Sequence, residues 1–284
     1  MPATINKDSA VPSLAMGRVV LTVHDLAGVR DYYQAAVGLH LLQSDGEVAL
    51  LGVGRDVLLE LRTDRHARRR SPGEAGLFHT AFLLPGRREL GSWVRFAIEK
   101  QIQVAGVADH LVSEAIYLND PEGNGIEIYR DRRPDEWRWT DGKVAMANEA
   151  LDVEGLVANG QGQPWQGVPE GSVVGHVHLQ VGTLDTAEAF YRDALGLDVT
   201  CYYPGAVFYA ADGYHHHVAT NIWNSRGAGM RSFPSTGLTA VDMKMSPERA
   251  AGLKARQGSA IVEDGEGFTL QDPWGTPIRI RTLG

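Results

Sequence analysis

The sequence has almost no cysteine: Cys201 is the single one among 284 residues. No intramolecular disulfide can form, and a reducing compartment is the simpler interpretation. No stretch approaches the ~18 uninterrupted apolar residues that indicate a membrane-spanning helix. The first residues, 1–13, lack the basic and apolar regions of a signal peptide. We therefore expect a cytoplasmic protein that is not attached to a membrane.

The chain also has no excess of positive charge. It carries 27 basic and 35 acidic residues, a formal net charge of −8. This balance argues against a surface that binds nucleic acid over the whole molecule. The one basic cluster, residues 66–70, stands before a Ser-Pro-Gly turn sequence and is typical of a solvated loop. We expect no nucleic-acid partner.

What the sequence does contain is an internal repeat. Residues 21–39 and 179–197 share a Leu-x-Val-x-x-Leu pattern, a later Tyr and a Gly-Leu pair at a constant offset of 158 (179 − 21 = 158). Self-similarity of this kind decides the architecture before any local prediction is made. With 43% hydrophobic and 22% charged residues, the composition is that of an ordinary globular protein. The repeat and the length together favour two similar halves.

The spacing of apolar residues predicts two units in each half, each with a strand, a helix and further strands. In the second unit of each half we expect a strand, a helix and two strands at 77–84, 88–100, 114–118 and 125–129, and at 238–245, 247–257, 268–270 and 277–281. The fold class is α+β, with four β-α-β-β-β units paired into cup-shaped sheets. We expect a flexible tail over 1–14, a first domain over 15–131, a linker over 132–171 with a short helix near 148–157, and a second domain over 172–284.

Three side chains that could bind one metal ion are divided between the halves. His79 and Glu127 lie in the first half and His176 in the second. The pattern Asp-Pro-x-Gly occurs twice, and the second copy is followed by Arg279 where the first is followed by Glu127. Two neutral imidazoles and one carboxylate suit a non-haem Fe(II) oxygenase, because three facial ligands leave neighbouring positions open.

Each of these residues also has a plainer explanation. A glutamate on a strand usually faces solvent, and a histidine in an apolar strand is usually a hydrogen-bonded core residue. His178 stands two residues after His176 and thus on the same strand face, so either imidazole could reach the same ion. It is equally a candidate for a substrate contact or for a donor that orients a ligand.

Three segments together resemble a known family: residues 109–127 (Asp-His-Leu-Val-Ser-Glu-Ala-Ile-Tyr-Leu-Asn-Asp-Pro-Glu-Gly-Asn-Gly-Ile-Glu), the strand Gly-His-Val-His-Leu at 175–179, and the triplet His-His-His at 215–217. They resemble the vicinal oxygen chelate superfamily, and within it the two-domain bacterial catechol-2,3-dioxygenases, the type I extradiol enzymes. The likeness runs from about residue 17 to 281. It implies cleavage of a catechol-type aromatic by O2 at one non-haem Fe(II), with Mn(II) as an alternative.

The resemblance also implies roles for single residues. The metal ligands match His79, Glu127 and His176. The acid/base histidine matches His216, which lies 40 residues after the first ligand (216 − 176 = 40), with His217 as the alternate. Tyr117, ten residues before Glu127 (127 − 117 = 10), and His110 match groups that bond to the substrate.

Neither half holds a complete ligand set. Arg18, Ala240 and Arg279 stand where the other half has His176, His79 and Glu127. If one metal is bound, the second unit of the first half must therefore pair with the first unit of the second half. The remaining two units would form a metal-free cup.

Two other functions compete with ring cleavage. One is a glyoxalase-like, metal-dependent isomerase or lyase, since one fold supports several chemistries. The other is a metal-free resistance protein that binds an aromatic drug in the cup. The number of histidines favours oxygen chemistry. Exposed sheet edges favour a homodimer.

Overall fold

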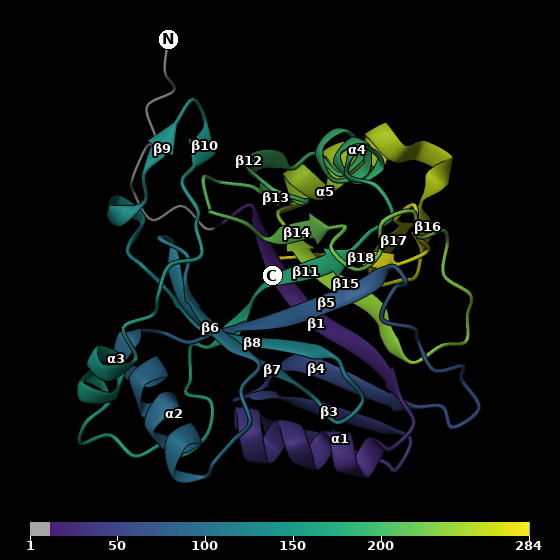
Figure 1. Cartoon of the computed structure of the whole chain (residues 1–284). Coiled ribbons are helices and arrows are strands. Elements are labelled where there is room, and N and C mark those ends of the chain that lie inside the picture. Colours follow the sequence, from purple (N-terminus) through teal and green to yellow (C-terminus); the bar gives the residue numbers. More distant parts are fainter. Residues whose placement is uncertain (1–11, 284) are drawn as a thin grey trace.

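The computed structural model describes residues 12–283, and these fold into four units of one topology (Figure 1). In each unit the first strand pairs in parallel with the fourth, and the third and second strands follow outward. A parallel pair needs a long crossover connection. The helix and the two outer strands of each unit form that crossover.

The elements of the first half are as follows. Unit 1 comprises β1 (Leu14–Val23), α1 (Leu26–Tyr32), η1 (Tyr33–Val37), β2 (His40–Ser44), β3 (Val48–Val53) and β4 (Asp56–Thr63). Unit 2 comprises β5 (Gly76–Leu83), α2 (Arg87–Glu99), β6 (Gly106–Asp109), β7 (Ser113–Asn119) and β8 (Gly125–Asp131). The connecting segment between the halves contains η2 (Pro134–Glu136), β9 (Trp139–Thr140), β10 (Lys143–Val144) and α3 (Val153–Asn159).

The second half repeats the same order. Unit 3 comprises β11 (Val173–Gln180), α4 (Leu184–Glu188), η3 (Ala189–Ala194), β12 (Asp198–Tyr203), β13 (Ala206–Ala210) and β14 (Val218–Asn221). Unit 4 comprises β15 (Gly237–Met245), α5 (Pro247–Gln257), η4 (Gly258–Ala260), β16 (Val262–Glu263), β17 (Gly267–Gln271) and β18 (Pro277–Thr282). Of the predicted tail over 1–14, residues 1–11 lie outside the described residues, and Leu14 already begins β1.

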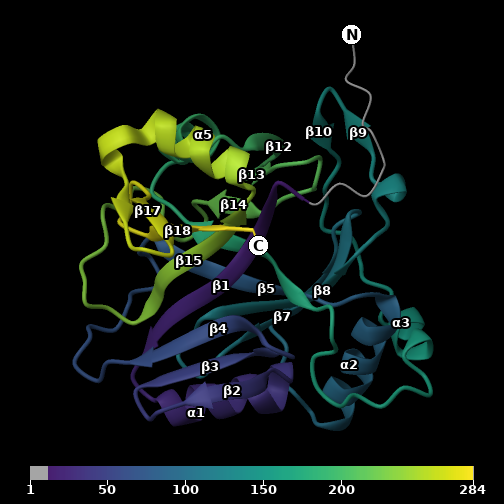
Figure 2. The same cartoon turned by 180° about the vertical axis from the view of Figure 1, so that it is seen from behind.

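The units pair across the two halves of the chain. Units 1 and 4 form one eight-stranded sheet through the antiparallel pair β1–β15, and units 2 and 3 form the other through β5–β11. The predicted α+β class with paired units is confirmed, and so is the pairing of units 2 and 3. Figures 1 and 2 show these central strands crossing the middle of the molecule, where β1 lies close to β11 and β5 close to β15. Each sheet therefore contains one unit from each half.

One continuous apolar core joins the two sheets. Helix α2 contributes Leu90, Trp93, Val94 and Ala97, which lie on one face because they are spaced three or four residues apart. Trp93 is fully buried, and its Nε1 donates to the backbone oxygen of Ala36 at 2.9 Å. This bond ties the helix of unit 2 to unit 1.

The connecting segment does more than join the halves. Its helix α3 begins later than predicted because Asp152 caps it, its carboxylate accepting from the Gly155 amide at 2.9 Å. The residues before it run extended, and Glu149 pairs with Asp109 at the edge of β6.

Within residues 12–283, no helix is long and apolar enough to cross a membrane.

Salt bridges fill the centre of the unit 1–4 sheet. Arg18, which stands at the position equivalent to His176, donates to Asp242 at 2.9 Å and lies 2.9 Å from Glu60. Arg279, at the position equivalent to Glu127, lies 3.8 Å from Asp242. Both carboxylates are buried. Two sheets of one topology thus carry different chemistry at equivalent places.

Candidate metal centre and cavity

The candidate ligands occupy two adjacent rows on one face of the unit 2–3 sheet. In the first row His178 pairs with His79, and His79 pairs with Gly125. In the second row His176 pairs with Ala81, which pairs with Glu127. Paired residues project from the same face of a sheet. Because Ala81 has only a methyl group, the His176 and Glu127 side chains converge over it toward His79.

A β-bulge shapes the first row. His178 and Leu179 on β11 pair with His79 and Leu77 on β5, so Phe78 is an extra residue. An extra residue bends the strand and re-aims its side chains, and the Phe78 ring lies 5.0 Å from that of His178. A Cβ on Gly125 would collide with the Phe78 carbonyl oxygen. Glycine in the Asp-Pro-x-Gly-Asn-Gly sequence therefore lets β8 approach this bulge.

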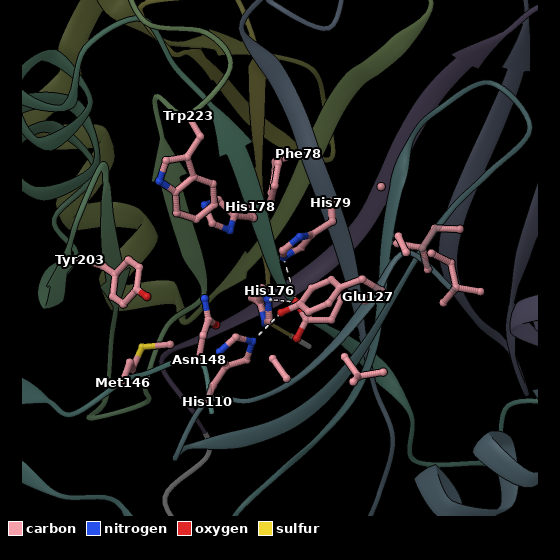
Figure 3. A pocket seen from close by; sticks show the side chains of 18 of the residues that line it. Phe78, His79, His110, Glu127, Met146, Asn148, His176, His178, Tyr203 and Trp223 are labelled. Carbon is pink, nitrogen blue, oxygen red and sulfur yellow. Dashed lines mark hydrogen bonds and ion pairs between the residues drawn. The ribbon is translucent and has the colours of Figure 1, made fainter. Parts of the chain in front are cut away.

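The side chains of the three predicted ligands, one from the first row and two from the second, converge at one point (Figure 3). His79 Nε2 lies 2.9 Å from Glu127 Oε2, and His176 Nε2 lies 3.1 Å from the same oxygen. One ligand atom from each residue lies within 4.8 Å of the others. All three side chains are buried, with 2–5% of each residue exposed.

The surroundings favour the protonation states that metal ligands need. Burial opposes the charge on Glu127, but the His176 and His79 imidazoles outweigh it and hold the pKa of the carboxyl well below its usual value. Burial lowers the pKa of His176 despite the nearby carboxylate. A carboxylate and a neutral imidazole are the forms that bind metals.

The donor set fits a divalent metal. His79 Nε2 is buried and lies near Glu127 at an angle that makes no hydrogen bond within residues 12–283. A buried nitrogen without a partner is costly in a folded protein unless something else satisfies it. Two imidazole nitrogens and one carboxylate are a donor set that suits a divalent metal of the non-haem iron type.

His110 and Tyr117 form a second group at the cavity. His110 Nδ1 lies 2.9 Å from the Ala147 backbone oxygen, which can only accept, so this nitrogen carries the proton. In the neutral ring Nε2 then accepts from the Tyr117 hydroxyl at 2.6 Å. Burial and the Glu127 carboxylate raise the pKa of Tyr117 well above its usual value. The phenol stays protonated, with its oxygen lone pairs free to accept.

His216 is held by a chain of hydrogen bonds. His215 Nε2 lies 2.8 Å from Asp131 Oδ1, and His215 Nδ1 lies 2.7 Å from His216 Nδ1. A carboxylate accepts, so His215 Nε2 donates and the neutral His215 accepts at Nδ1. His216 must then donate from Nδ1, which leaves its Nε2 unprotonated. Its ring lies 4.0 Å from that of His176.

The groups above share a cavity of about 560 Å³. Its wall includes all six predicted site residues, His79, His110, Tyr117, Glu127, His176 and His216, and also His178. His217 is not among the described residues that line it; its Nδ1 accepts from the Ala211 amide at 3.4 Å.

Sequence reasoning missed two parts of this cavity. One is the run Met146, Ala147, Asn148 and Glu149 of the connecting segment, which forms part of the wall. The other is a set of three apolar rings, Phe78, Phe208 and Trp223. No local pattern in the sequence marked either part.

Comparison with known proteins gives matches over most of the chain. The family model of the Glyoxalase/Bleomycin resistance protein/Dioxygenase superfamily matches residues 15–128 and 173–280. The chain is 37% identical over 269 residues to catechol-2,3-dioxygenase of Bacillus subtilis (strain 168). The alignment covers 91% of this chain and 93% of that protein. It is 28% identical over 142 residues to biphenyl-2,3-diol 1,2-dioxygenase 2 of Rhodococcus globerulus, covering 45% of this chain and 68% of that protein.

Solved structures share the fold. A proposed dioxygenase from Bacillus subtilis superposes with a TM-score of 0.64 at 12% identity, covering 96% of this chain and 86% of that one. Glyoxalase I from Zea mays superposes with a TM-score of 0.57 at 16% identity, and the match covers 95% of this chain and 92% of that one. At such identities the likeness concerns the fold alone.

Proposed function

This chain belongs to the glyoxalase/bleomycin resistance protein/dioxygenase superfamily, and on that premise we propose that it is an extradiol dioxygenase, which opens a catechol ring with O2. His79, Glu127 and His176 would hold the metal, which we propose to be Fe(II), with Mn(II) as the alternative. The observation that carries this proposal is the position of His216. Its ring contacts His176 at the wall of the same cavity and offers an unprotonated nitrogen.

The bound metal would lower the pKa of the catechol hydroxyls and bring the ring and O2 together. By holding the metal, His79, His176 and Glu127 would fix where the substrate oxygens lie. Fixed placement of this kind removes much of the entropic barrier between two reactants.

The remaining polar groups handle protons and charge. His216 Nε2 takes a proton and returns it, as a general base and acid does in the course of a reaction. Tyr117, held by His110, keeps its hydroxyl oriented toward the cavity. Oriented dipoles stabilise developing charge most effectively when they are fixed in advance.

The proposal is tested by loading the protein with ferrous iron and catechol without oxygen and then admitting air. We expect oxygen uptake equal to the catechol consumed and a yellow ring-cleavage product, followed by absorbance. A matched sample of Glu127→Ala should give neither. If the loaded wild-type protein consumes no oxygen with any catechol, the proposed function is wrong.

A further inference from the structure

The cavity extends well beyond the metal cluster. Its volume of about 560 Å³ lies within the range of roughly 300–1,000 Å³ typical of pockets that enclose drug-sized ligands. An unsubstituted catechol is one six-membered ring with two oxygens. When those oxygens face the cluster, much of the cavity is left for whatever else the substrate carries.

Three apolar rings, Phe78, Phe208 and Trp223, line this remaining space; we call them the aromatic wall. Phe78 lies 5.4 Å from Trp223. Phe208 lies 5.0 Å from His216 and 5.9 Å from His178, and so continues the wall on the other side of His178. Figure 3 shows Phe78 and Trp223 on one side of the cluster and His110 on the opposite side.

Trp223 offers only its apolar surface to the cavity. Its Nε1 donates to the Pro204 carbonyl oxygen at 2.9 Å, which fixes the ring and uses its one polar group. The side chain is 46% exposed and so stands at the mouth. An aromatic face held in this way packs well against a second flat, apolar group.

Away from the proposed metal, the described residues of the cavity wall offer no lysine or arginine to an acidic substituent. Outside the proposed ligands, the one acidic residue among the described lining residues is Glu149. A carboxylate buried without a partner is costly, and a neighbouring like charge adds to that cost.

We propose that the aromatic wall selects catechols that carry a flat, apolar substituent, and that the cavity rejects catechols that carry a carboxylate. This inference rests on the proposed function, and it deepens that function by naming the substrate class. The substituent packs between Phe78, Phe208 and Trp223 while the two hydroxyl groups face His79, His176 and Glu127.

The test compares three probes on the iron-loaded protein: catechol, 3-phenylcatechol and 3,4-dihydroxybenzoate. We expect kcat/KM for 3-phenylcatechol to exceed that for catechol roughly tenfold or more, the scale of discrimination by an apolar pocket. The dihydroxybenzoate should rank last. In Trp223→Ala the ratio of 3-phenylcatechol to catechol should collapse toward one, and Trp223→Phe should largely preserve it. The matched control is Trp139→Ala, which removes an exposed tryptophan outside the cavity wall and should keep the wild-type ratio.

Anaerobic calorimetry separates this inference from the proposed function. Fe(II)-loaded protein without oxygen should bind 3-phenylcatechol more tightly than 3,4-dihydroxybenzoate, and Trp223→Ala should lose that margin. Such binding without any ring cleavage would overturn the proposed function and leave the aromatic wall supported. Equal binding of the two probes, preference for the carboxylate, or a ratio unaffected by Trp223→Ala would overturn the inference.

Discussion

His215 and His216 share a hydrogen bond between their two Nδ1 atoms, 2.7 Å long. Because Asp131 fixes the proton of His215 on Nε2, the bond also fixes the proton of His216 on Nδ1. Two adjacent imidazoles thus have different roles: one lines the cavity, and the other determines which nitrogen its neighbour presents there.

We therefore expect His215→Phe to lower kcat by about 10²-fold or more, the scale of a general acid/base contribution, while KM for catechol and the iron content change little. Asp131→Asn should act in the same direction, because the amide can also donate to His215. The matched control is Tyr214→Phe, which removes a 2.8 Å bond to the other Asp131 oxygen and leaves the His215 contact in place. Equal losses in Tyr214→Phe and His215→Phe would indicate a merely structural effect.

His216→Ala should retain iron and lose most of its turnover, with kcat reduced about 10²–10⁴-fold. His217→Gln, one residue further along, should keep most of the turnover because His217 is directed toward the Ala211 amide. Steady-state kinetics and metal analysis on the two purified variants would check this. Full turnover by His216→Ala would refute its assignment.

The ligand assignment predicts that variants of the neighbouring residues His176 and His178 differ in the amount of iron they retain. Glu127→Ala and His176→Ala should lose most of their iron after anaerobic loading and desalting, because each leaves a two-ligand site. His178→Ala should keep its iron. His178 pairs with His79 on the neighbouring strand but is not one of the three residues whose ligand atoms lie together. Iron loss in His178→Ala together with iron retention in His176→Ala would show that His178, and not His176, is the ligand.

The buried His217 should make stability depend on pH. Burial, reinforced by the nearby His215, lowers the pKa of His217 to about 3 from 6.5. Below pH 6.5 the unfolded chain takes up a proton that the folded chain does not bind, so stability is lost as pH falls. At pH 5, 1.5 units below 6.5, the loss is about 2 kcal/mol at 1.36 kcal/mol per unit. Urea unfolding at pH 7.5 and 5.0 should show a smaller difference in His217→Gln than in wild type.

The cluster of candidate ligands and the sheet pairing could be predicted from the sequence because they depend on short-range patterns. The turn before Glu127 and the alternation around His79 and His176 mark strands with a polar residue on an otherwise apolar face. Since neither half contains all three candidate ligands, we expected units 2 and 3 to pair, and the antiparallel pair β5–β11 confirms this pairing.

Other features depend on contacts that no local pattern contains. His215, His216 and His217 precede β14, so strand alternation could not tell which of them faces the cavity. Alternation would direct Phe78 away from His79, but the bulge brings its ring toward His178. The wall formed by Met146 to Glu149 depends on the pairing of Glu149 with Asp109, forty residues earlier (149 − 109 = 40).

The exchange of units between sheets has a consequence for how the two halves can change over time. Arg18 and Arg279 stand in one sheet at the positions that His176 and Glu127 occupy in the other, and the two sheets share no unit because each draws on separate units of both halves. A duplicated gene could therefore lose one reaction centre entirely while neither of its copies became dispensable. For the same reason, we expect that neither half expressed alone would retain any activity, and that mixing the two halves would be the only way to recover it.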